Sequence, residues 1–282
     1  MGLFDKKFCD ICRSKIGLLG NRKLEDGNLC KDCAAKLSPF FSERRQSTVE
    51  EIRAQLAYRE ENKASVAAFH TTRSFGRNTK ILLDEDARKF MVTSARNLME
   101  ANPDVLDYSQ VTGCNLDIDE HRTELKHADK DGKQVSFVPP RYEYSYDFRV
   151  IISVNHPYFD SITVRLNPNT VKVGQQPIGR TDRHNAGAAN VSAIKGKIVS
   201  NVLGALAGQG MNPITSWNPE YNEYFNMGQE IVNTLTQARE GIRQEVMDRN
   251  APRMAVTCPW CGATTMPDAA GCCEYCGGSL NG

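Results

Sequence analysis

Apolar and polar residues alternate most regularly between residues 142 and 155, and this alternation predicts a β-strand with one buried face. Every even position carries an apolar or aromatic side chain, and most odd positions are polar; a period of two is typical of a strand lying on a core. The alternation resumes at 161–166, which predicts an antiparallel hairpin. The aromatic row also resembles a stacking platform for bases, but only Arg141 and Arg149 lie nearby, so we prefer a packed sheet face.

Shorter patterns predict further elements before this strand. Residues 81–92 hold two apolar stretches around an acidic turn, which indicates a hairpin. Residues 94–101 favour one or two helical turns, and 108–118 favours a strand. In that strand Cys114 is expected to be a small core residue rather than a nucleophile, because no histidine or asparagine partner is identifiable. Residues 70–78 are interpreted as a polar loop.

Three- and four-residue spacings predict two long helices. The first covers about 47–67 and opens with a capping box, Ser47-Thr-Val-Glu50. Its later part, 59–63, is charged all round, so we expect a weakly anchored connector rather than a partner-binding helix. The second runs over 218–248 from an asparagine cap followed by proline and glutamate. One of its faces is predicted to lie on the sheet, and that face holds Tyr221, Tyr224, Phe225, Gly228, Ile231, Val232, Leu235, Ile242 and Val246.

Residues 175–210 are rich in glycine, alanine and asparagine. We expect a loop at 179–187 and a short amphipathic helix at 191–206. Lys195 and Lys197 lie beside the apolar stripe of that helix, which leaves membrane-surface binding open. A phosphate-binding loop is excluded, because the Gly-Lys pair lacks both the earlier glycine and the following serine or threonine.

Eight of the ten cysteines fall into four Cys-x-x-Cys pairs, and these predict two metal sites. Each pair aims two thiolates at one ion, and two pairs complete the tetrahedral shell of a structural zinc. A disulfide framework fits poorly because no export signal is present. A redox pair or an iron–sulfur cluster explains two quartets less simply. The expected ligands are Cys9, Cys12, Cys30 and Cys33 in the first site and Cys258, Cys261, Cys273 and Cys276 in the second.

The segment around the first quartet suggests a treble-clef-like finger. Asp26-Gly27 predicts a hairpin turn because glycine tolerates positive φ, and 30–37 predicts a brief helix that ends before Pro39. Residues 9–39 resemble the N-terminal zinc-binding domain of an uncharacterised family of bacterial proteins, catalogued as a domain of unknown function. The resemblance implies a zinc site at the four N-terminal cysteines and a bacterial source, and it implies no activity.

The last cysteines lie in Cys258-Pro-Trp-Cys261-Gly and Cys273-Glu-Tyr-Cys276-Gly-Gly, which resemble a zinc ribbon. Cys272 is an alternative ligand, but only Cys273 keeps the two-residue gap to Cys276. A domain below roughly 40 residues cannot bury enough apolar surface to fold unaided. This tail is therefore expected to be unfolded without metal.

These elements predict an α+β chain in four parts. We expect the N-terminal finger at 1–45, a helical connector at 46–78, a central antiparallel sheet with a C-terminal amphipathic helix at 79–248, and the ribbon at 249–282. The central part weakly resembles bacterial pleckstrin-homology-like domains. That is a likeness of fold, and such domains serve many roles.

Length and charge narrow the function. The 282 residues contain no apolar run of roughly 20 and no secretory signal, so a cytoplasmic location is expected. The formal charge of +1 would become −3 with two four-thiolate zinc sites, because each adds four negative and two positive charges. Nucleic-acid affinity depends mainly on Lys and Arg. Only the finger is suitably basic, through Arg13, Lys15, Arg22 and Lys23.

No catalytic motif is evident: the chain lacks His-Glu-x-x-His, Gly-x-Ser-x-Gly and a glycine-rich nucleotide loop. The densest titratable cluster, at 117–121, is interpreted as an exposed strand end. We therefore expect no catalytic residues and no cofactor beyond zinc. The preferred hypothesis is a non-catalytic adaptor in protein–protein or membrane-proximal assembly, with a protein partner and an undetermined oligomeric state. The alternatives are a nucleic-acid-binding regulator using the finger, tested by replacing Arg22 and Lys23, and lipid binding by the central domain through Lys195 and Lys197.

Overall fold

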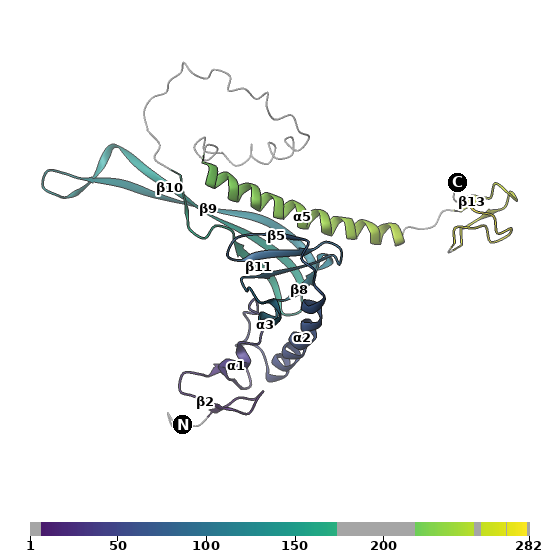
Figure 1. Ribbon diagram of the computed structural model, residues 1–282, viewed down its shortest axis with the longest axis horizontal. Coiled ribbons are helices and arrows are strands. Elements are labelled where there is room, and N and C mark those ends of the chain that lie inside the picture. Colours follow the sequence, from purple (N-terminus) through teal and green to yellow (C-terminus); the bar gives the residue numbers. More distant parts are fainter. Residues whose placement is uncertain (1–6, 174–217, 251–254, 269, 281–282) are drawn as a thin grey trace, which may run out of the picture. The chain divides into compact units, whose positions relative to one another are not determined.

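The computed structural model describes residues 7–173, 218–250, 255–268 and 270–280 (Figure 1). The chain divides into two units, 1–239 and 240–282. The predicted α+β class is confirmed, because helices combine with sheets whose strands all pair antiparallel. The loop and helix predicted within 175–210, with Lys195 and Lys197, lie outside the described residues.

The N-terminal finger consists of two small hairpins and a short helix. Strands β1 (Lys7–Phe8) and β2 (Lys15–Ile16) form the first hairpin, and β3 (Arg22–Lys23) and β4 (Asn28–Leu29) form the second. Helix α1 (Lys31–Ala34) follows directly. The predicted hairpin is therefore confirmed, and the helix predicted at 30–37 is present but shorter, because it ends at Ala34.

Helix α2 (Val49–Ala68) begins one residue later than the sequence pattern indicated. Its capping box joins Thr48 to Glu51, not Ser47 to Glu50: the Glu51 amide donates to Thr48 Oγ1 at 3.2 Å, and the Thr48 amide donates to Glu51 Oε2 at 2.7 Å. The expectation that the charged part of this helix is weakly anchored is wrong. Arg59 and Asn62 are both buried, because polar partners elsewhere in the chain receive them.

The first sheet contains four antiparallel strands in the order β5 (Arg73–Phe75), β6 (Lys80–Asp84), β7 (Lys89–Thr93) and β8 (Val105–Asp107). The hairpin predicted at 81–92 is confirmed. The loop predicted at 70–78 is wrong in part, because Phe75 is buried and pairs with Ile81 as part of β5.

Two short helical segments surround strand β8. Helix α3 (Leu98–Ala101) precedes it, as the sequence predicts, and the 3-10 turn η1 (Tyr108–Gln110) follows it. The strand expected from residue 108 therefore starts only at Val111.

The second sheet is built on a long hairpin of β9 (Val111–Ala128) and β10 (Gln134–His156). On its other edge β10 pairs with β11 (Phe159–Arg165) and with β12 (Val171–Val173). The predicted alternation is confirmed, since the even positions from 146 to 154 of β10 are buried.

Helix α5 (Pro219–Asn250) packs its first half on this sheet. The ring of Tyr221 lies 5.0 Å from that of Tyr146 and 4.9 Å from that of Phe148. A Cβ on Gly228 would lie 2.4 Å from Leu116 Cδ1, so glycine lets the helix approach β9 closely. The predicted buried face ends near Leu235; Val246 is 47% exposed, which corrects the expectation for the last turns.

The C-terminal segment carries the small hairpin β13 (Val256–Thr257) and β14 (Thr264–Thr265). None of the helices in the described part of the chain combines the length and apolar composition required to span a bilayer.

Candidate metal centres

The first quartet places four thiols around one point in the finger. Cys9 and Cys12 lie between β1 and β2, whereas Cys30 and Cys33 lie at the start of α1. All four sulfurs lie within 4.8 Å of one another, and Cys12 Sγ is 3.7 Å from Cys30 Sγ. Four sulfurs at about 2.3 Å from a tetrahedral ion are about 3.8 Å apart. The arrangement therefore fits a single tetrahedral ion.

A tight knuckle holds the first cysteine pair. The Cys9 amide donates to Ser14 O at 2.9 Å, and the Arg13 amide donates to Cys9 O at 2.8 Å. Closing the turn places Arg13 at φ 62°, the left-handed region that side chains other than glycine rarely adopt. No feature noted in the sequence marked Arg13 as a strained position.

The second pair of the finger is held by a helix start. Cys30 is the N-cap of α1, and its sulfur accepts a hydrogen bond from the Cys33 amide at 3.3 Å. One knuckle plus one helix N-terminus is the ligand arrangement expected of a treble-clef-like finger.

The second quartet uses two knuckles instead. Cys258 Sγ lies 3.6 Å from Cys276 Sγ, and Cys261 Sγ lies 3.7 Å from Cys273 Sγ. In each knuckle the first cysteine carbonyl accepts from the glycine four residues on, Gly262 at 2.9 Å and Gly277 at 2.8 Å. Both glycines have positive φ, at 73° and 70°, in the position that Arg13 occupies in the finger. This pattern is that of a zinc ribbon.

Cys272 does not join the second quartet. The grouped sulfurs belong to Cys258, Cys261, Cys273 and Cys276. Cys272 Sγ instead lies 3.9 Å from the carbonyl of Ala270. The choice of Cys273 over Cys272 therefore agrees with this geometry.

The pKa values of the clustered thiols depart from their ordinary value in both directions. Burial raises the pKa of Cys33, whereas hydrogen bonds to Ser14 lower the pKa of Cys12 to about 6. The Gly278 amide favours ionisation of Cys276, but the neighbouring sulfurs outweigh it and raise its pKa to about 12. Four thiolates therefore repel one another unless a metal neutralises them, and metal binding would release protons.

A hydrophobic core supports the first quartet and extends into α2. Ile52 of α2 is fully buried there. The buried members of this core are Cys9, Ile16, Leu24, Leu29, Cys30, Cys33, Leu37 and Ile52. The start of α2 is therefore part of the finger rather than of a connector.

Hydrogen bonds tie the second hairpin to the start of α2 and to the first knuckle. Asp26 Oδ1 accepts from the Val49 amide at 2.7 Å, and Asp10 Oδ2 accepts from the Asn28 amide at 2.7 Å. A Cβ on Gly27 would lie 2.5 Å from Val49 Cγ2 and 2.8 Å from Asp10 Oδ2. Gly27 does not have positive φ, so the expected reason for a glycine here is wrong: close packing requires it.

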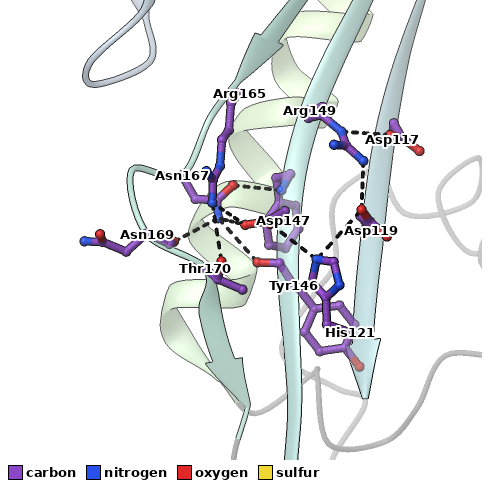
Figure 2. A network of polar contacts seen from close by, with 11 residues as sticks. Asp117, Asp119, His121, Tyr146, Asp147, Arg149, Arg165, Asn167, Asn169 and Thr170 are labelled. Carbon is purple, nitrogen blue, oxygen red and sulfur yellow. Dashed lines mark hydrogen bonds and ion pairs between the residues drawn. The ribbon is translucent and has the colours of Figure 1, made fainter. Parts of the chain in front are cut away.

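The titratable cluster at 117–121 forms an ion-pair network on β9 and β10 (Figure 2). Arg149 donates to Asp117 Oδ2 at 3.2 Å and to Asp119 Oδ2 at 3.0 Å. His121 Nε2 lies 3.4 Å from Asp147 Oδ2. Its expected place at a strand end is wrong, since these residues lie within paired strands.

The acidic members of this network have polar or cationic partners from neighbouring strands and from the connection between β11 and β12. Asp147 also pairs with Arg165 at 2.6 Å. Burial opposes ionisation of Asp147, but hydrogen bonds from Asn167, Thr170 and Arg165 outweigh it and lower its pKa. The network therefore joins strands, and the described residues that group as possible metal ligands are the two cysteine quartets.

Together, these features define a mixed α/β protein with two four-cysteine centres, each able to hold one metal ion. Residues 7–55 match a family described as "Domain of unknown function (DUF4428)". No curated protein and no solved structure matches the chain. The matched segment ends beyond the boundary predicted at residue 45 and includes Ile52, which completes the finger core.

Proposed function

We propose that the chain is a non-catalytic adaptor in which two structural zinc modules precede and follow a sheet-and-helix body. The observation that carries this proposal is the composition of the two centres: each offers four thiolates to one ion. A tetrahedral zinc with four cysteine ligands keeps no position for water or substrate, so it stabilises structure rather than performing chemistry. An iron–sulfur cluster with several irons would hold sulfurs on different irons farther apart than the 4.8 Å within which all four sulfurs of each quartet lie.

Two exposed aromatic residues on the ribbon support a protein partner. Trp260 is 75% exposed and Tyr275 is 74% exposed, and each lies inside a knuckle between two candidate ligands. Trp260 Nε1 donates to Ser279 O at 3.3 Å. The indole ring also packs on Gly278, since a Cβ on that glycine would lie 2.5 Å from Trp260 Cδ1. Positioned, exposed Trp and Tyr side chains are typical anchors of protein interfaces.

The zinc content tests the structural part of this proposal. Native mass spectrometry of the full chain should show two zinc ions per chain, and alkylation should leave the eight clustered thiols unmodified until a chelator is added. Fewer than two bound ions, or thiols oxidised to one another, would contradict it.

A capture experiment tests the adaptor part. Crosslinking and affinity capture from the host should yield proteins that are lost with Trp260→Ala/Tyr275→Ala and kept with Met266→Ala. Met266 is a suitable control because it is an exposed apolar side chain of the same ribbon, at 56%. Identical capture by all three proteins would remove the support from the aromatic pair.

The basic surface of the finger supports nucleic-acid binding as a second candidate. Within the described residues no ion pair joins Lys15, Arg22 or Lys23 to a carboxylate. Cations without a carboxylate partner can contact phosphates, and such binding weakens steeply with salt. Salt-dependent binding to duplex or single-stranded nucleic acid that disappears in Arg22→Gln/Lys23→Gln would reverse our ranking.

A further inference from the structure

Two adjacent leucines protrude from the turn that joins β2 to β3 in the finger. Leu18 is 90% exposed and Leu19 is 86% exposed. They occupy the centre of a four-residue turn closed by a hydrogen bond from the Gly20 amide to Gly17 O at 3.0 Å. The neighbouring apolar residues Ile16 and Leu24 are buried in the finger core. The two leucines therefore add nothing to that core, and exposed apolar pairs of this kind mark contact surfaces.

Cations surround this turn. Lys15 precedes it in β2, one residue before the buried Ile16, and Arg22 and Lys23 follow it in β3. Arg22 Nη1 donates to Leu19 O at 3.4 Å, and Arg44 Nη1 donates to Lys23 O at 2.9 Å. Burial lowers the pKa of Arg44, and the nearby charges of Arg22 and Arg45 lower it further. The apolar tip is therefore bordered by positive charge.

The residue type of the apolar tip favours a membrane over a protein as its partner. Trp, Tyr and Arg are enriched among the residues that anchor protein interfaces, whereas leucine is under-represented among them. A bilayer needs no complementary groove: apolar side chains enter the headgroup boundary while neighbouring cations meet anionic lipids. A protruding pair of leucines with lysine and arginine residues beside it can make both of these contacts with an anionic bilayer.

We propose that the turn at 17–20 docks the finger onto anionic membranes, with Leu18 and Leu19 entering the bilayer and Lys15, Arg22 and Lys23 contacting lipid phosphates. This inference rests on the adaptor proposal and names a partner for its first module. It assigns lipid binding to the finger rather than to Lys195 and Lys197.

The test uses the zinc-loaded full chain and vesicle co-sedimentation. Vesicles with about one third phosphatidylglycerol in phosphatidylcholine should bind the protein, binding should weaken as salt is added, and pure phosphatidylcholine should bind it poorly. Leu18→Ser/Leu19→Ser should weaken binding by roughly tenfold or more. Lys15→Gln/Lys23→Gln should weaken it by roughly fivefold for each charge removed.

A matched control is available on α5, where Val246 and Met247 are adjacent exposed apolar residues, at 47% and 51%. Val246→Ser/Met247→Ser should bind vesicles like the unmodified protein. No binding of the unmodified protein to anionic vesicles, or equal binding by the Leu18/Leu19 variant, overturns the inference. Binding to nucleic acid but not to vesicles, unaffected by the leucine changes, also overturns it.

Zinc analysis of the same samples separates the two proposals. Two bound zinc ions without vesicle binding would refute membrane docking by the turn at 17–20 and would leave the adaptor proposal intact. Fewer than two zinc ions would remove the structural-zinc basis of the adaptor proposal itself.

Discussion

Replacement of Arg59 should destabilise the contact between α2 and the first sheet. Arg59 is 5% exposed and lies 2.7 Å from Asp104, which is fully buried. Its guanidinium also donates to Lys36 O at 3.2 Å and to Asn102 O. Asp104 accepts a further hydrogen bond from Ser38 Oγ at 2.7 Å. The finger, α2 and the segment before β8 therefore share one buried polar network.

The structure allows an estimate of the cost. Arg59→Met keeps most of the side-chain volume but leaves Asp104 buried with only the Ser38 hydroxyl, so unfolding should become easier by about 3–5 kcal/mol. Arg59→Met/Asp104→Leu removes both charges and should cost less than the single change. The double variant still leaves the carbonyl groups of Lys36 and Asn102 without the donor that Arg59 supplied. Each lost hydrogen bond should lower the free energy of unfolding by at most about 1–3 kcal/mol.

Urea unfolding in excess zinc, followed by circular dichroism, measures these differences. Lys63→Met is the control, because its ion pair with Glu60 is exposed and should contribute little. A loss below about 1 kcal/mol in Arg59→Met would refute the reasoning, since a buried charge left without its partner costs more than that.

Three further predictions follow from the knuckles and the first sheet. Arg13→Gly should stabilise the finger by about 1 kcal/mol or less, because glycine adopts the left-handed conformation at little cost and the other two knuckles have glycine at this position. Thermal unfolding in the presence of zinc measures this change in stability. A loss of stability would argue against backbone strain at Arg13. Zinc chelation should raise hydrogen exchange throughout 255–280 before it does so in the finger. The reason is that the ribbon buries little besides its cysteines, whereas the finger retains a hydrophobic core. Earlier exchange in the finger would contradict this prediction. Burial opposes ionisation of Asp84, but hydrogen bonds from the His70 amide at 2.8 Å and the Ala87 amide at 2.9 Å outweigh it and lower its pKa. The contribution of Asp84 to the stability of the fold is therefore complete above about pH 4. It is lost as the pH falls through the lower folded pKa. Asp84→Asn should reduce stability at neutral pH and flatten that acid limb, and an unchanged pH profile counts against the assignment.

Local patterns predicted the elements whose signal lies in adjacent residues. The alternation along β10 and the spacing along the first half of α5 follow from one face meeting a core, so each could be predicted without knowing the partner. Cysteine spacing predicted which thiols assemble, because a two-residue gap brings two sulfurs to one ion. These features require no knowledge of distant contacts.

Buried polar contacts could not be predicted in this way. Arg59 and Asn62 carry the signature of a solvated face, and their burial depends on Asn102 and Asp104, about forty residues away in the sequence. The network on β9 has the same origin, since Asp119 meets Arg149 only once β9 and β10 pair. A hydropathy pattern indicates which apolar residues are buried, but it does not show which polar residues find distant polar partners.

The place where the finger ends follows from how α2 is used. Its first turns supply Ile52 to the finger core and receive the Asp26 carboxylate at the Val49 amide, whereas its middle carries Arg59 into the network with Asp104. A boundary at residue 45 would remove a fully buried isoleucine and a helix cap from the finger. The match to residues 7–55 includes both contacts and stops before Arg59. The core of the finger therefore extends into α2, and this helix connects the first cysteine quartet with the buried network around Asp104.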